Sequence, residues 1–125
     1  MSEAYKGFID EMVSLAHSCV SADRIAKHGD PVRSNLDDLA PDEREQAIRA
    51  LYQRLSRPEK QTLADCLRAE RVSALHDFAA FLEWATSCDE MQISWKGVEL
   101  KPFATMHHDF IGRIQGHDWR EVQIG

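Results

Sequence analysis

The sequence lacks the short motifs that mark the commonest catalytic and nucleotide-binding sites. No glycine-rich phosphate loop is present, because Gly29, Gly97, Gly112 and Gly116 stand singly, without the spacing that a phosphate cradle needs. A GxSxG nucleophile elbow and an HExxH zinc motif are absent as well. These absences argue against a P-loop nucleotide hydrolase, a serine hydrolase and a zinc protease.

Long apolar runs are also missing. No stretch approaches the roughly 18 apolar residues that a membrane-spanning helix needs. The opening MSEAYKGFID places acids where a secretion signal has its apolar region. We therefore expect a protein that neither spans a membrane nor carries a secretion signal.

Cysteine is scarce and unpatterned. Cys19, Cys66 and Cys88 are an odd number without CxxC spacing, and each lies among apolar helix positions. We therefore expect buried free thiols in a reducing compartment, and hence a cytoplasmic protein. Cys88 is the best candidate nucleophile, but the carboxylates of Asp89 and Glu90 beside it disfavour the thiolate that catalysis requires.

Positive charge is too sparse for a nucleic-acid-binding protein. The formal net charge is −6, whereas phosphate binding needs a concentrated cationic face. The charge is uneven: seven basic residues and four acids lie between Arg44 and Arg71, but five acids and only Lys96 lie between Ser73 and Glu99. Solvated helix faces explain such segregation, and a sharper interpretation is an acidic docking surface for a basic partner.

The most informative stretch present is Ser73 to Trp95, which predicts an amphipathic helix followed by a short extended segment. On a helical wheel of about 100° per residue, His76, Ala80, Glu83 and Ser87 form a polar stripe, with Trp84 on its border. The opposite, apolar arc is roughly 180° wide and contains Ala74, Leu75, Phe78, Ala79, Phe81, Leu82, Ala85 and Cys88. We expect the other helices to pack around this one, with Phe78, Phe81 and Leu82 all facing inward.

The rest of the pattern predicts a mainly α protein, a single helical domain over residues 1–125 built as a bundle of five to six helices with one short β-hairpin near residues 91–100. Further helices are expected at residues 3–20 with a continuation to His28, 41–55, 56–72 and 103–114, with a connector over residues 29–40. Ser56 and Glu59 have the spacing of a capping box at the start of the helix over residues 56–72. Apolar residues recur every three or four positions in the first helix (Tyr5, Phe8, Ile9, Met12, Leu15, Ala16, Cys19) and in the helix over residues 41–55 (Ala47, Ile48, Leu51, Tyr52, Leu55), and we expect them to face inward. Met91, Ile93 and Trp95 alternate with polar residues before the turn signal Lys96-Gly97, which places the hairpin.

Histidine and aspartate form the only candidate catalytic cluster. His76-Asp77 and His107-His108-Asp109 carry the residue types of metal sites and of acid–base catalysis, as does His117-Asp118. The doublets invite comparison with HD-domain phosphohydrolases, but adjacent histidines point about 100° apart on a helix and do not easily bind one ion. A small metal-dependent hydrolase using His76, Asp77, His107, His108 and Asp109 is therefore the alternative function.

Tryptophan gives the main functional indication. Trp84 borders the apolar arc, Trp95 lies in the expected hairpin and Trp119 lies in the tail, where it would pin the chain end. Tryptophan at the border of burial and water is typical of contact surfaces, although all three could instead complete a small core. The leading hypothesis is a non-enzymatic protein-binding module or homodimer, without a cofactor. Its binding surface would consist of Trp84, Asp89, Glu90, Trp95 and Glu99.

Two stretches carry a resemblance. The segment LEWATSCDEMQISWKGVELKPFATMHHDF and the opening YKGFIDEMV resemble a family of small bacterial cytosolic proteins of unknown function. This resemblance implies no activity, cofactor or site residue. In size, acidity and helical content the chain is also similar to the immunity proteins of bacterial toxin systems, a likeness at the level of fold alone.

Overall fold

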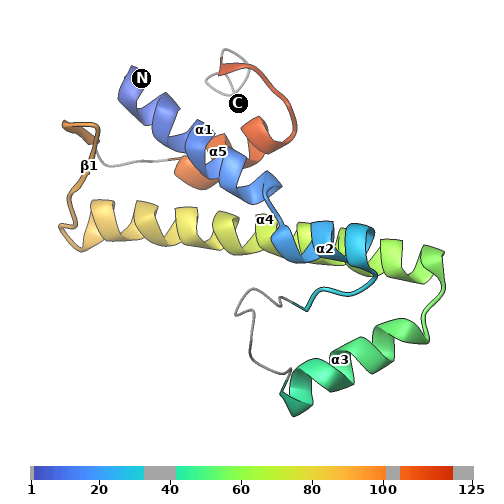
Figure 1. Cartoon of the computed structure of the whole chain (residues 1–125). Helices are drawn as coiled ribbons and strands as arrows, with labels where there is room; N and C mark the ends of the chain where they lie inside the picture. The colour runs from blue at the N-terminus through green and yellow to red at the C-terminus, as the bar shows by residue number, and fades with distance from the viewer. Residues whose placement is uncertain (1, 33–41, 101–104, 120–125) are drawn as a thin grey trace. The chain divides into compact units, whose positions relative to one another are not determined.

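The computed structural model describes residues 2–32, 42–100 and 105–119, and the chain forms two compact units. Unit 1 contains Met1–His17 and Val72–Gly125, and unit 2 contains Ser18–Arg71. The described elements are α1 (Glu3–His17), α2 (Val20–His28), α3 (Glu43–Gln53), α4 (Arg57–Cys88), β1 (Ile93–Trp95), β2 (Val98–Leu100) and α5 (Met106–Ile114) (Figure 1). The mainly α class with one short hairpin is confirmed. The single domain over residues 1–125 stays a prediction. α4 supplies residues to both units.

The core of unit 1 is built from α1, the second half of α4, β2 and α5. α1 buries one face because its apolar residues recur every three or four positions, as the sequence predicts. Met106 and Phe110 of α5 are fully buried against that face. The buried cluster consists of Tyr5, Ile9, Met12, Ala16, Ala79, Leu82, Leu100, Met106 and Phe110.

Unit 2 has a smaller core of its own, which consists of Cys19, Ala22, Ile25, Tyr52 and Ala64. α2 ends at Gly29, whose positive φ of 87° is the left-handed conformation that glycine adopts at little cost. α3 begins after Asp42, whose carboxylate accepts a hydrogen bond of 2.8 Å from the Glu45 amide. The expected helix end is confirmed, and α3 begins at Glu43 rather than at Pro41.

The predicted break between two helices at Val72–Ser73 is wrong. α4 runs without interruption from Arg57 to Cys88, a length of 32 residues. The capping box at its start is confirmed, because the Glu59 amide donates to the Ser56 hydroxyl and the Glu59 carboxylate accepts from the Ser56 amide. No glycine or proline follows Pro58 within the helix, and a serine that is not preceded by such a breaker continues a helix at small cost.

The chain does break where one helix with a continuation was expected. α1 ends at His17 and α2 begins at Val20, with Cys19 in an extended conformation between them. Cys19 is buried, as predicted, whereas Cys66 and Cys88 are exposed free thiols, so the prediction of three buried cysteines is wrong. Leu51 of α3 is also exposed rather than buried.

The short sheet pairs β1 with β2 in antiparallel register, with Ile93 opposite Leu100 and Trp95 opposite Val98. The two-residue turn between them has positive φ at both Lys96 (51°) and Gly97 (78°), the conformation of a type I′ hairpin turn. The predicted hairpin is therefore confirmed. It packs against the helices of unit 1 through Ile93, Trp95 and Leu100, because an isolated hairpin of this size is only marginally stable.

Two of the expected features lie partly or wholly outside the described residues. Of the connector expected over residues 29–40, only Gly29 to Val32 is described, and Val32 is buried. The start of the last helix at Phe103 is not described, and α5 is seen from Met106 onward. Within the described ranges, no helix combines the length and the apolar character that crossing a membrane requires.

Candidate functional site

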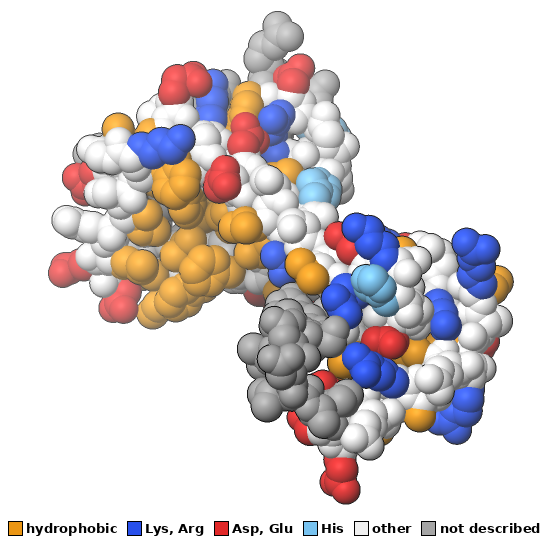
Figure 2. Space-filling view, viewed as in Figure 1, with side chains coloured by type: hydrophobic (Ala, Val, Ile, Leu, Met, Phe, Trp, Pro, Cys, Tyr) orange, Lys and Arg blue, Asp and Glu red, His pale blue; other side chains and the backbone are white. Residues whose placement is uncertain are grey.

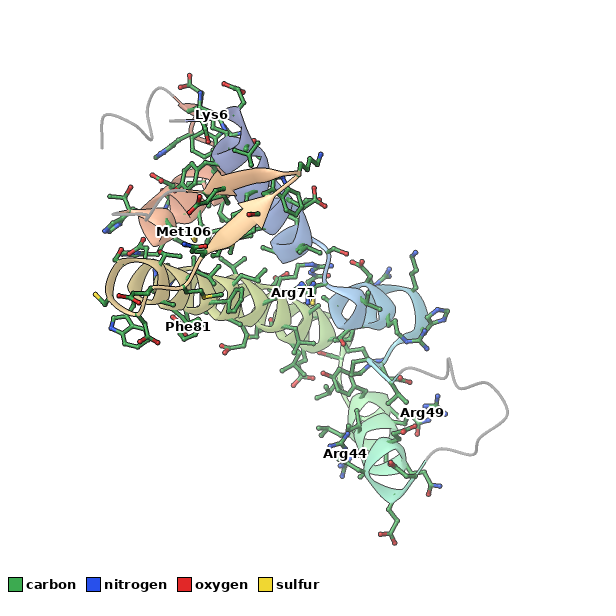
Figure 3. The ribbon with its side chains drawn as sticks, turned by 90° about the vertical axis from the view of Figure 1, so that its left-hand side faces the viewer. Lys6, Arg44, Arg49, Arg71, Phe81 and Met106 are labelled. Atoms are coloured by element: carbon green, nitrogen blue, oxygen red, sulfur yellow. The ribbon has the colours of Figure 1, made fainter. Side chains whose placement is uncertain are left out.

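The second half of α4 exposes its largest apolar side chains. Phe78, Phe81 and Trp84 are 50%, 51% and 54% exposed. Their rings follow one another along the helix, with centroids 6.2 Å apart between Phe78 and Phe81 and 6.3 Å apart between Phe81 and Trp84. Phe81 lies on the side of α4 that faces away from Met106 in the core (Figure 3). We call these three residues the aromatic face.

The predicted orientation of α4, with Phe78, Phe81 and Leu82 all facing the core, is wrong. Of the three side chains expected inside, Leu82 is 3% exposed, but Phe78 and Phe81 are half exposed. The core side of the helix carries Ala79, Leu82 and Ala85, and α1 and α5 cover only that part of the arc. Ala74 and Cys88, from the same predicted arc, are exposed as well.

The buried and exposed sides of α4 differ in the size of their side chains. Ala79 and Ala85 face the core beside Leu82 and allow neighbouring helices to approach closely, whereas the three large rings of the aromatic face are exposed. Figure 2 shows the result as an area of hydrophobic side chains on one face of unit 1. The sequence indicates only that part of this arc stays exposed, because an arc of about 180° is wider than the stripe that one layer of neighbours covers.

Acidic side chains accompany the aromatic face. Asp77 precedes Phe81 by four residues and Trp84 by seven, a spacing that places the three on one side of a helix. Its side chain is 82% exposed. Asp89 and Glu90 follow directly after α4 and are exposed. The surface around the rings therefore carries negative charge.

The binding residues predicted from the sequence are distributed over α4 and the hairpin. Trp84, Asp89, Glu90 and Glu99 are exposed. Trp95 is half-buried, with its ring packed edge-on against Phe8 at a centroid distance of 5.6 Å. Trp95 therefore acts mainly as a packing residue of unit 1. Phe78 and Phe81, which the sequence reasoning placed in the core, join Trp84 on the exposed surface instead.

The histidines of the alternative site lie near one another, but Asp109 does not join them. The ring centroids of His76 and His107 are 5.4 Å apart, and those of His107 and His108 are 4.1 Å apart. Asp77 pairs with its neighbour His76 at 3.2 Å on the surface. Asp109 is 3% exposed and accepts hydrogen bonds from the hydroxyls of Tyr5 and Thr105. In the described part of the chain, no three His, Cys, Asp or Glu side chains are arranged to hold a metal ion.

A carboxylate that the sequence analysis did not single out connects this histidine group to α4. Glu83 accepts two hydrogen bonds of 2.7 Å from His107, one from its backbone N–H and one from its ring Nδ1. The backbone bond satisfies an amide in the first turn of α5, where a negative charge also interacts favourably with the helix dipole. Glu83 therefore holds α5 against α4 and serves the packing of unit 1.

The tail of the described chain is fixed in the same unit. The Trp119 indole donates a hydrogen bond of 3.2 Å to Asp10, and the Arg113 guanidinium donates one of 2.8 Å to the other oxygen of the same carboxylate. Arg113 also lies over the Trp119 ring, 5.2 Å from its centroid. The expectation that Trp119 pins the tail is confirmed, which leaves Trp84 as the exposed tryptophan of the three.

Comparison with known proteins adds a family but no activity. The model of a family of unknown function (DUF6547) matches residues 1–121. No curated protein and no solved structure matches the chain. The resemblance to a family of unknown function is thereby confirmed, and the arrangement of side chains is the basis for a functional proposal.

Proposed function

The chain belongs to the DUF6547 family of unknown function, and we propose that it is a non-enzymatic protein-binding module. Its contact surface is the aromatic face of α4 together with the acids Asp77, Asp89 and Glu90. Trp84 belongs both to the binding surface predicted from the sequence and to the aromatic face. Glu99, the remaining acid of the predicted binding surface, is exposed on β2.

One observation carries the proposal: α4 buries Ala79, Leu82 and Ala85 in the core and leaves three large aromatic rings half exposed to water. Exposed single apolar residues are ordinary, but contiguous rings forming a patch are typical of interaction sites. Aromatic side chains, tryptophan above all, contribute most of the binding energy in many protein interfaces. A partner that covers the three rings would remove their exposed apolar area from water, which favours binding.

Photo-crosslinking tests this proposal without requiring that the partner be known. A benzophenone amino acid is introduced at Phe81, and separately at Leu51 as a control, because Leu51 is an exposed apolar residue of unit 2. Both variants are irradiated in cells of the source organism. We expect a discrete crosslinked species with the probe at position 81 and none with the probe at position 51.

The mass of the crosslinked species identifies the kind of partner. A species of twice the chain mass would indicate a homodimer, and any other discrete mass a different protein. The crosslink at position 81 should disappear when Trp84→Ser is added. Crosslinking that is equal at both positions, or that is absent at position 81, would contradict the proposal.

We also propose that the protein acts in the cytoplasm. The three cysteines are free, and two of them, Cys66 and Cys88, are exposed to solvent. Exposed free thiols persist in a reducing compartment and are rare where disulfides form. Cell fractionation with an antibody against the protein would test the location.

A further inference from the structure

We infer that the aromatic face binds a short amphipathic helix of a partner protein, one that carries apolar residues beside lysine or arginine. This inference rests on the proposed function and adds the chemical class of the partner. Three properties of the surface around Phe78, Phe81 and Trp84 point to it: its charge, its area and its shape.

The charge of this region has one sign. Between Val72 and Trp95 the sequence contains four acids and neither lysine nor arginine. Glu83 is engaged by His107 and its side chain is only 14% exposed, which leaves Asp77, Asp89 and Glu90 facing solvent. A partner with basic residues at the border of its apolar stripe would pair with these carboxylates. Charge complementarity of this kind contributes specificity and speeds association.

The area of the aromatic face fits a short segment rather than a folded domain. An aromatic side chain buries on the order of 150–250 Å², so three half-exposed rings offer roughly 300 Å². A standard protein interface needs about 800 Å² from each partner. A single helix that contributes a few apolar anchors matches the smaller area.

The shape of the face is a continuous row of three rings. The centroid separations are 6.2 and 6.3 Å, and the three positions span six residues, or about 9 Å of helix. Positions three residues apart on a helix form a ridge that is inclined by about 45° to the helix axis. Apolar anchors spaced three or four residues apart on a second helix can pack into the groove beside such a ridge. A second helix can therefore pack across this row of rings.

The same charge pattern disfavours two other occupants. A second copy of this chain, placed face to face on the aromatic face, would bring Asp77, Asp89 and Glu90 close to the same acids of its partner, which costs free energy. A lipid bilayer with anionic headgroups would be repelled by these carboxylates. Tryptophan and phenylalanine alone would suit a membrane surface, but basic residues are missing from their border.

Titration with a designed peptide tests the inference. The probe is a fluorescently labelled peptide of leucine and lysine in amphipathic helical spacing, and its control replaces every lysine with glutamate. Fluorescence anisotropy measures the Kd of each peptide for the full-length protein. We expect saturable binding of the lysine peptide, and binding of the glutamate peptide that is at least tenfold weaker.

Matched variants assign the binding to this surface. Phe81→Ala and Trp84→Ala should each weaken binding of the lysine peptide at least tenfold, since truncated anchors have effects of this size. Leu51→Ala, an equally exposed apolar residue on α3, should leave the Kd within twofold. The combination Asp77→Asn, Asp89→Asn and Glu90→Gln should weaken binding severalfold, and Glu43→Gln should not. Circular dichroism confirms that each variant remains folded.

The opposite results would overturn the inference. Equal Kd values for the lysine and glutamate peptides, or equal effects of Trp84→Ala and Leu51→Ala, would show that binding does not use the acidic aromatic face. Co-sedimentation with anionic lipid vesicles, or self-association abolished by Trp84→Ala, would assign the face to a membrane or to a second copy. If the lysine peptide fails to bind while the crosslink at position 81 is found, only the partner class is wrong, and the proposed function remains.

Discussion

The hydroxyl of Tyr5 donates a hydrogen bond to the carboxylate of Asp109, joining residues that are 104 positions apart. Tyr5 lies in α1 and Asp109 in the first turn of α5, and both side chains are buried in unit 1. Asp109 also accepts from the Thr105 hydroxyl at 3.2 Å. A buried carboxylate needs such donors, because an unsatisfied one is costly to keep away from water. The bond therefore ties the beginning of the described chain to its end.

The Tyr5→Phe substitution tests the importance of this bond. It keeps the ring in the core and removes the donor to Asp109, so it should lower the free energy of unfolding by about 1–3 kcal/mol. Urea denaturation followed by circular dichroism measures the change. The double variant Tyr5→Phe with Asp109→Leu serves as a control, since removing both partners should cost less than the sum of the two single changes. Additive effects would show that the two groups do not interact.

Stability at alkaline pH gives a second test of the same pair. Burial raises the pKa of Tyr5 above its ordinary value of 10.0, and the hydrogen bond to Asp109 and the negative charges of Asp109 and Glu83 add to the rise. The unfolded chain then releases the Tyr5 proton at a lower pH than the folded chain does. The stability that the neutral hydroxyl provides is therefore complete below pH 10 and is lost progressively as the pH rises above that value.

Denaturation curves at a series of alkaline pH values would measure this loss. The wild-type protein should lose stability more steeply above pH 10 than Tyr5→Phe, which has no phenol at that position. Tyr52 is also buried and its pKa is raised by burial, with a smaller effect from Asp30. The alkaline slope of Tyr52→Phe is therefore compared with that of Tyr5→Phe, to separate the contributions of the two tyrosines. Identical alkaline slopes for wild type and Tyr5→Phe would contradict the assignment.

The sequence was informative where a strong local signal marks a helix start, a helix end or a turn. The capping box of Ser56 and Glu59, the stop at Gly29 and the Lys96-Gly97 turn each depend on residues close together in the chain, and each lies where it was predicted. The apolar stripe of α1 was also predicted, since Tyr5, Ile9, Met12 and Ala16 are buried, whereas Leu15 of the same stripe is exposed.

The direction of α4 could not be read from periodicity, for a physical reason. An apolar arc of about 180° can turn either half toward the core, and periodicity does not say how much of the arc the neighbouring helices will cover. The packing of α1 and α5 decided that Ala79 and Leu82 lie inside and Phe81 outside. Long-range pairs such as Glu83 with His107 have no local signature either.

The hairpin turn offers a stabilising substitution. Lys96 holds a left-handed conformation with φ of 51°, which asparagine tolerates better than lysine does. Lys96→Asn should therefore raise the free energy of unfolding by about 0.5 kcal/mol. The Lys96 ammonium also lies over the Trp95 ring at 5.8 Å, and asparagine loses this contact. Lys96→Gln is the control, since it loses the same contact without the backbone preference, and it should give no gain.

Paired substitutions on α4 test directly which side of the helix faces the core. Leu82→Ala removes a side chain that is 3% exposed and should lower the free energy of unfolding by about 2–5 kcal/mol. Phe81→Gln changes a half-exposed ring on the other side of the helix and should alter it by no more than about 0.5 kcal/mol. Both values come from urea denaturation of the purified protein. If Phe78 and Phe81 faced inward, as the sequence alone predicts, Phe81→Gln would place an amide in the core. The loss of free energy of unfolding would then be as large as that of Leu82→Ala or larger. Equal and large losses for the two variants would therefore place Phe81 in a core and remove the aromatic face as a binding surface.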